Sequence, residues 1–180
     1  WIKTGSLDTS FGTKQVIFDM WNNEAISSDA YGRLTIELTS GAGAGNPLLI
    51  TAQSGAASSS AQMCFTSSLG QNLGASDFSA WAHYAIKMYN SGTSFVTDLY
   101  VNGYLNDTNV YASSLNELNS KNMIARIGGL TTAPSGSSAA AGSGKLSASL
   151  DEFRFWKVAR TGEEIGKNWF GQIRGGVNTD

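Results

Sequence analysis

The sequence predicts an all-β fold: a two-sheet antiparallel β-sandwich of the jelly-roll type with one short C-terminal helix. Three observations support this prediction. Apolar and polar residues alternate along most of the chain, stretches rich in Gly and Ser separate the alternating segments, and a single segment carries helix signals. Alternation with a period of two is typical of strands with one buried face. About ten such strands with one terminal helix indicate two packed sheets.

The alternating segments are the expected strands. They lie at 15–21, 32–40, 47–53, 61–67, 80–90, 95–107, 123–129 and 145–156. In 32–40, three apolar residues share one face while Arg33, Thr35 and Glu37 share the other, which is the pattern of a half-buried strand. The segment 95–107 runs into Asn102-Gly103, a pair that favours a tight hairpin turn because both residues tolerate positive φ.

The helix is expected to begin at Thr161. Thr161 and Glu164 form a T-x-x-E capping box, in which each side chain satisfies a free backbone N–H of the first turn. Glu163 and Glu164 also suit the positive end of the helix dipole. The stretches 40–46, 54–61 and 133–144 are rich in Gly, Ser and Ala, and we expect them to be solvated connectors.

Composition excludes several classes of function. The 180 residues suffice for one domain over 1–180, and the net charge of −2 gives no electrostatic basis for binding nucleic acid. No apolar run approaches the ~20 residues that cross a bilayer, so no membrane insertion is expected. His83 is the single histidine and Cys64 the single cysteine, which argues against a zinc cluster. Cys64 alternates with apolar neighbours and is expected to be a small buried residue.

Three segments in order resemble the concanavalin A-like jelly roll of laminin-G-like domains. Residues 81–103, "WAHYAIKMYNSGTSFVTDLYVNG", resemble that family's W-x-H-x-A-x-x-Y strand followed by its L-Y-x-N-G hairpin. Residues 125–129, "ARIGG", resemble its strand that ends in Ile-Gly. Residues 144–165, "GKLSASLDEFRFWKVARTGEEI", resemble its closing strand and short capped helix. Residues 1–3, "WIK", resemble the tryptophan strand that usually comes second, which implies that the family's first strand is not within residues 1–180.

Asp151 and Glu152 are the acidic pair to explain. Glucanases of this jelly roll use E-x-D-x-x-E, which is absent here, and retaining hydrolysis needs two carboxyl groups roughly 5–5.5 Å apart on one face. Consecutive strand residues point to opposite faces, so this pair predicts no catalytic site and a protein that is not an enzyme. Asp151 would share a face with Phe153 and Phe155 and would need a partner there, since an unpaired buried charge is costly.

Backbone N–H groups, an arginine or a cation could each be that partner. The resemblance implies calcium as the cofactor to consider, because many laminin-G-like domains bind it. Asp151 would then be a ligand, and Asp8, Asp29 and loop carbonyls are candidates for the others. A structural Asp151, hydrogen-bonded to backbone, is the alternative. No other cofactor is expected.

The fold and the loops predict a non-catalytic extracellular recognition or adhesion module that binds a glycan or a protein on an exposed surface. Tyr104, Asn106 and Asp107, just past the hairpin turn, are the candidate ligand-binding residues, because sugars stack on aromatic rings and bond to amides and carboxylates. His83 is expected to be a packed residue. The alternative is a structural subunit or decoration domain of a virion, fibre or cell-surface assembly. Both place the protein outside the cell, on a cell surface or on a virion.

A missing first strand would leave an open edge beside residues 1–3. An open edge presents unpaired N–H and C=O groups and favours pairing with another strand. The segment 172–180, a neighbouring subunit or a flanking segment of a longer chain could fill it. Self-completion by 172–180 is the least expected, because that segment is polar and rich in Gly. Self-assembly through the edge is therefore a candidate interaction.

Overall fold

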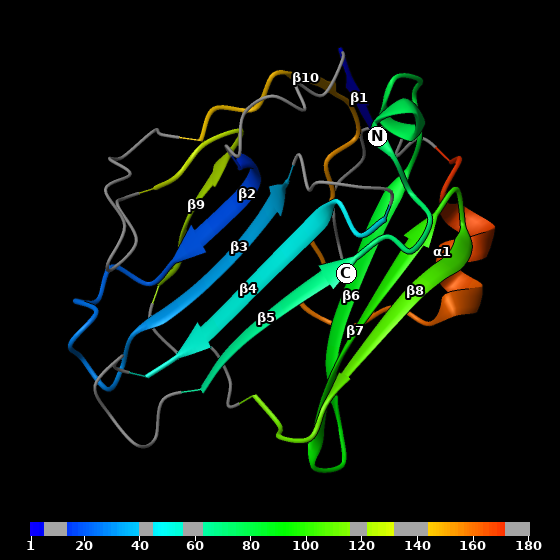
Figure 1. Ribbon diagram of the computed structural model, residues 1–180. Coiled ribbons are helices and arrows are strands. Elements are labelled where there is room, and N and C mark those ends of the chain that lie inside the picture. The colour runs from blue at the N-terminus through cyan, green and yellow to red at the C-terminus, as the bar shows by residue number, and fades with distance from the viewer. Residues whose placement is uncertain (6–13, 40–44, 56–62, 116–121, 132–143, 172–180) are drawn as a thin grey trace.

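The structure is a computed structural model that describes residues 1–5, 14–39, 45–55, 63–115, 122–131 and 144–171. It confirms the expected all-β fold, with antiparallel sheets and one short α-helix (Figure 1). The elements are β1 (Ile2–Thr4), β2 (Gln15–Trp21), β3 (Gly32–Leu38), β4 (Leu48–Ser54), β5 (Met63–Leu69), the 3₁₀ helix η1 (Ala75–Phe78), β6 (Tyr84–Ser91), β7 (Ser94–Val101), β8 (Tyr104–Tyr111), β9 (Ile124–Ile127), β10 (Ala148–Leu150) and α1 (Gly162–Asn168).

The larger sheet has five strands in the order β5-β4-β3-β2-β9. Strands β2 to β5 are neighbours both in sequence and in space, whereas β9 returns from far along the chain to pair antiparallel with β2. The pairing of β2 with β3 shifts register between Val16 and Phe18, which is a β-bulge. Phe18 and Met20, beyond this bulge, point toward the second sheet and help to line the space between the sheets.

The second sheet contains β6, β7 and β8 in that order. β7 and β8 are joined by the predicted hairpin, in which Asn102 and Gly103 have φ values of 49° and 82°. Positive φ at both positions matches the right-handed twist of the strands. Gly103 is needed here for a second reason, because a Cβ at this position would collide with the ring of Trp169.

The short strand β1 links the second sheet to β10. Ile2 pairs with Leu150 of β10 on one edge and forms a bridge with Ala82 on the other. The bridge consists of Ile2 N–H donating to the Ala82 carbonyl at 3.0 Å and Ala82 N–H donating to the Ile2 carbonyl at 3.2 Å. β10, β1 and the chain just before β6 therefore lie side by side. The open edge expected beside residues 1–3 is wrong, because β1 pairs with β10 on one edge and with Ala82 on the other.

Polar side chains join the two sheets on the β5 side. Ser67 of β5 and Thr97 of β7 share a hydrogen bond of 3.0 Å, and Asn109 of β8 donates to Ser67 Oγ at 2.9 Å. Ser67 and Thr97 are almost fully buried, so these bonds satisfy hydroxyls that burial would otherwise leave without a partner. The sandwich is therefore closed along this seam.

The C-terminal helix α1 begins as predicted. Thr161 Oγ1 accepts from the Glu164 N–H at 3.1 Å, and the Glu164 carboxylate accepts from the Thr161 N–H at 2.7 Å. α1 lies beside the β7–β8 hairpin (Figure 1), where Gly166 faces the Gly103 carbonyl. Within the described ranges no helix has the length and apolar character needed to cross a bilayer.

The predicted strand over 145–156 is much shorter in the structure. Strand β10 ends at Leu150, and Glu152 has a positive φ of 50°, which interrupts the extended path. Beyond this residue Phe153 and Phe155 still share a face, as predicted, and both contact Phe18. Asp151 is exposed instead of lying in an apolar layer.

Two burial predictions are also wrong. Cys64 is exposed. Arg33, Thr35 and Glu37, expected on the solvated face of their strand, are buried. Arg33 is buried because it pairs with Asp19 on the neighbouring strand β2. Its Nε and Nη2 donate to the two carboxylate oxygens of Asp19 at 2.9 and 2.8 Å.

The Asp19 carboxylate is the centre of this buried network and has an exposed fraction of 0%. It also accepts hydrogen bonds from Thr35 Oγ1 at 2.9 Å and from the Thr131 N–H at 2.7 Å. The Asp19 carboxylate thus ties β2 and β3 to the chain that follows β9. A buried carboxylate is tolerable here because every contact is a charge-assisted hydrogen bond.

We predict that Arg33→Met lowers the free energy of unfolding by about 3–5 kcal/mol, because it leaves the buried Asp19 charge without its cation. Urea unfolding measures the effect. The matched control is Lys167→Met, which removes a cation from an exposed pair with Glu163 on α1 and should cost under about 0.5 kcal/mol. Similar small losses in both variants would contradict the prediction.

Candidate functional site

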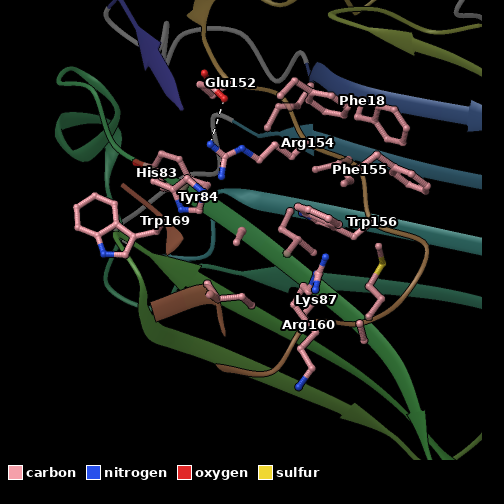
Figure 2. Close-up of a pocket in the computed structure, with 18 of the residues that line it drawn as sticks. Phe18, His83, Tyr84, Lys87, Glu152, Arg154, Phe155, Trp156, Arg160 and Trp169 are labelled. Atoms are coloured by element: carbon pink, nitrogen blue, oxygen red, sulfur yellow. Dashed lines mark hydrogen bonds and ion pairs between the residues drawn. The ribbon is translucent and has the colours of Figure 1, made fainter. Parts of the chain in front are cut away.

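A groove of about 1440 Å³ lies between the two sheets on the β2 side of the sandwich (Figure 2). Its walls come from β2, β3, β6 and the segment 150–160 that follows β10. This volume exceeds the roughly 300–1,000 Å³ of ordinary ligand pockets. The sandwich is therefore closed at the Ser67–Thr97 seam and open on its other side.

One end of the groove is aromatic. Phe18 of β2 stacks on Phe153 with ring centroids 5.3 Å apart and contacts Phe155 at 5.9 Å. Because Glu152 breaks the alternation, these two phenylalanines face the larger sheet although they lie beyond the end of β10. Phe155 is still 51% exposed, so the contact leaves much apolar surface open.

A second aromatic cluster closes the other end. Trp1 lies against His83 with centroids 5.8 Å apart and against Trp169 at 5.5 Å. Figure 2 shows His83, Tyr84 and Trp169 together at this end, with Arg154 between them and the Phe18 cluster. The cluster brings together the N-terminus, the chain before β6 and the end of α1.

His83 lies in an environment that favours its neutral form. Desolvation by burial, with a smaller contribution from the nearby Trp1 ammonium, lowers the pKa of His83 to about 4. Its Nδ1 is buried without a hydrogen-bond partner among the described residues. Its backbone N–H donates to the side chain of Asn102 at 2.9 Å, which fixes the chain at the start of β6. The expected packed histidine fits this position.

The carboxylates of the groove do not form a hydrolytic pair. Glu152 accepts from Arg154 Nη2 at 3.1 Å and forms an ion pair with it. Asp151 Oδ1 accepts from the Glu152 N–H at 2.9 Å, a bond that helps to hold Glu152 in its positive-φ conformation. Glu152 is thus engaged by a cation, and Asp151 holds the backbone of the turn.

Calcium at Asp151 stays a prediction. In the described ranges no group of three or more His, Cys, Asp or Glu residues could hold a metal ion. Asp29 is exposed and belongs to no such group, and Asp8 lies outside the described residues. A calcium ion at Asp151 would therefore depend on backbone carbonyls and water for its remaining ligands.

A second candidate site lies at the start of β8, and we call it the hairpin edge. It contains the predicted ligand residues Tyr104, Asn106 and Asp107. A register shift between Leu99 and Tyr100 leaves Asn106 as the bulged residue of β8. Asn106 Nδ2 then reaches the Gln71 carbonyl at 3.4 Å, and Asp107 Oδ2 accepts from the Gln71 N–H at 3.1 Å. The bulge thus brings Asn106 and Asp107 onto the same loop.

The three residues of the hairpin edge differ in their freedom to bind. Asp107 also accepts from the Gly70 N–H at 3.0 Å and from the Thr108 N–H at 2.8 Å, so its carboxylate anchors the loop. Asn106 Oδ1 is buried and has no hydrogen-bond partner among the described residues. Tyr104 is 79% exposed and is the most exposed large hydrophobic side chain of the described residues. The Tyr104 ring is therefore the group of the hairpin edge that is open to a ligand.

Sequence patterns did not reveal several groove residues. Trp156 lies under the Arg160 guanidinium, whose central carbon is 3.9 Å from the ring centroid. Both residues lie between the end of β10 and α1, and Arg160 lies outside every strand that alternation predicts. Trp169, at the end of α1, reaches Trp1 from 168 positions away, and no local pattern encodes a contact over that separation.

The pKa of His83 predicts an acid-sensitive fold. Above about pH 6.5, His83 is neutral in both the folded and the unfolded chain. Its contribution to the free energy of unfolding is then fully present. As pH falls from 6.5 toward 4, the unfolded chain binds a proton that the folded chain excludes, so the free energy of unfolding decreases. His83→Phe keeps a ring in the cluster and should reduce the difference between urea unfolding at about pH 7 and about pH 5. An identical pH dependence in both proteins would refute this assignment.

Asp151→Ala is predicted to destabilise the fold by about 0.5–1.5 kcal/mol, because it removes one hydrogen bond from an exposed turn. The destabilisation is smaller than at a buried strand end, because Asp151 is exposed. Thermal melting with and without EDTA tests the calcium prediction at the same time. If calcium binds at Asp151, EDTA lowers the melting temperature of the wild type and leaves the variant unchanged, whereas equal responses rule out calcium at this residue.

Comparison with known proteins identifies the family. A crystal structure of residues 221–444 of an S-layer domain-containing protein from Clostridium thermocellum is 24% identical, with a TM-score of 0.36 over 89% of this chain. The chain spans 64% of that solved chain, which is less than two thirds of its length. No curated protein matches. A family model described as the concanavalin A-like lectin/glucanases superfamily (Laminin_G_3) matches residues 1–166, so the chain belongs to this superfamily.

Proposed function

We propose that this protein is a non-catalytic, surface-associated recognition or adhesion module that binds a glycan at its hairpin edge. The observation that carries the proposal is the Tyr104 ring, which is 79% exposed at the start of β8. Aromatic rings stack on the apolar faces of sugars, and amides bond to their hydroxyls. Membership of a superfamily that contains lectins supports this choice of ligand. A protein on the same exposed surface is the alternative ligand.

The hairpin edge is built for recognition because its backbone is fixed before a ligand arrives. Asp107 holds the loop at Gly70 and Gln71 by two hydrogen bonds. A preorganised site loses less conformational entropy on binding than a mobile one. In this proposal Tyr104 contacts the ligand, and Asn106 and Asp107 hold the hairpin edge in position.

The carboxylates that line the groove support the proposal that the protein is not an enzyme. The superfamily includes glucanases as well as laminin-G-like domains, which are generally non-catalytic. Retaining glycosidases need two carboxyl groups roughly 5–5.5 Å apart, one of them protonated. In the described part of the groove Glu152 is paired with Arg154, and Asp151 accepts from backbone. This arrangement lacks both a free nucleophile and a proton donor opposite it.

A structural subunit of a virion, fibre or cell-surface assembly is the second candidate function. The observation that favours it is the edge of β6, which pairs only with β7 among the described strands. A strand donated by a neighbouring subunit would pair with this edge and produce an ordered assembly. An extracellular or surface location is proposed for either function.

Binding to a glycan array tests the proposed function. Tyr104→Ala should weaken binding about fivefold, since the loss of one aromatic stacking contact is worth about 1 kcal/mol. The matched control is Leu105→Ala, the adjacent exposed residue of β8, which should bind like the wild type. Asn106→Ala should also weaken binding. No glycan binding by the wild type, or equal binding by the Tyr104 and Leu105 variants, would contradict the proposal.

The non-catalytic proposal has its own test. Wild type and Glu152→Gln should both leave β-glucan hydrolysis at the background rate, measured as released reducing ends. Hydrolysis by the wild type that Glu152→Gln abolishes would overturn the proposal and make Glu152 a catalytic residue.

A further inference from the structure

The packed face of α1 carries two glycines. Four residues between Thr161 and Phe170 are half-buried, and they are Gly162, Ile165, Gly166 and Trp169. Spacings of three and four residues place them on one side of the helix. Glycine is a poor helix former, so a helix of seven residues gains no stability of its own from two of them. Their place on the packed face therefore indicates a need for close approach.

The β7–β8 hairpin is what this face contacts. A Cβ at Gly162 would lie 2.9 Å from the Tyr100 hydroxyl, and a Cβ at Gly166 would lie 3.3 Å from the Gly103 carbonyl oxygen. The Trp169 ring lies so near to Gly103 that a Cβ at Gly103 would collide with it. The helix therefore covers the hairpin from the end of β7 to the turn (Figure 1).

Trp169 also contacts the residue to which the turn is bonded. Its ring centroid is 6.2 Å from that of His83, and Figure 2 shows the two rings together. His83 and Asn102 are joined by two hydrogen bonds of 2.9 Å, one from the Asn102 N–H to the His83 carbonyl and one from the His83 N–H to the Asn102 side chain. Trp169 therefore packs on the turn and on the chain just before β6 that holds it.

We propose that Trp169 and the two glycines of α1 are positioning residues for glycan recognition, which fix the hairpin turn and, through it, the Tyr104 ring. Tyr104 directly follows Gly103, and its exposed side chain has little packing of its own to hold it. Asp107 fixes the other side of the hairpin edge at the Gly70–Gln71 loop. The inference rests on the proposed function, because it concerns the same site.

The physical effect of this packing is preorganisation. A stacking contact requires the aromatic ring to meet the sugar at a set position and angle. A turn held by α1 keeps the backbone of Tyr104 in place before the glycan arrives, so less conformational entropy is lost on binding. A residue that acts only in this way changes the affinity when the Tyr104 ring is present and leaves it unchanged when the ring is absent.

A double-mutant cycle tests whether Trp169 acts through Tyr104. Trp169→Ala is made in the wild type and in Tyr104→Ala, and the dissociation constant is measured for the array glycan that the wild type binds most tightly. Trp169→Ala should weaken binding about threefold in the wild type and under about 1.5-fold in Tyr104→Ala. Trp169→Phe keeps a ring on the turn and should restore most of the affinity. Equal weakening in both backgrounds would overturn the proposal.

Gly166→Ala separates positioning from helix stability. Alanine is the better helix former, so α1 itself is not weakened, whereas the added Cβ presses on the Gly103 carbonyl. Binding should weaken about twofold. The matched control is Lys167→Ala on the exposed face of α1, which should bind like the wild type. Equal affinities of the Gly166 and Lys167 variants would contradict the assignment.

Hydrogen exchange of the turn tests the proposal without a glycan. The Asn102 amide should exchange at least about fivefold faster in Trp169→Ala than in the wild type and at the wild-type rate in Lys167→Ala, with the β3 amides as internal reference. A wild type that binds no glycan refutes the proposed function. An Asn102 rate that Trp169→Ala leaves unchanged refutes the positioning role, so the two failures are distinguishable.

Discussion

The geometry of this domain depends on the double pairing of β1. Three residues of β1 hold β10 on one edge, and Ile2 holds the chain before β6 on the other. Because β1 pairs with both, it lies between β10 and the chain that leads into β6. The aromatic cluster of Trp1, His83 and Trp169 closes the end of the groove that β1 reaches.

Two polar networks stabilise parts of the sandwich that β1 does not contact. The Ser67–Thr97 bond joins the sheets on the β5 side, and the Asp19–Arg33 pair ties β2, β3 and Thr131 within the larger sheet. Both are buried and hydrogen-bonded, so they favour one arrangement of the sheets. The side between β2 and β6 has no such connection among the described residues, and apolar side chains there remain partly exposed.

The groove and the hairpin edge are distinct surfaces with different chemistry. The groove is lined largely by aromatic and aliphatic side chains. The hairpin edge presents an exposed aromatic ring on a strand that is hydrogen-bonded to the Gly70–Gln71 loop. The expected acidic pair lines the groove, where Glu152 pairs with Arg154 and Asp151 supports the turn.

The sequence by itself determined the strands, the Asn102-Gly103 hairpin and the Thr161 capping box, since each depends on residues a few positions apart. It also placed Tyr104 at an exposed turn. Only the tertiary structure decided the burial of Arg33, the end of β10 at Leu150 and the groove, because these depend on Asp19, on the positive φ of Glu152 and on the register of β1. Alternation says which side chains share a face of a strand, whereas pairing between distant segments decides what each face meets.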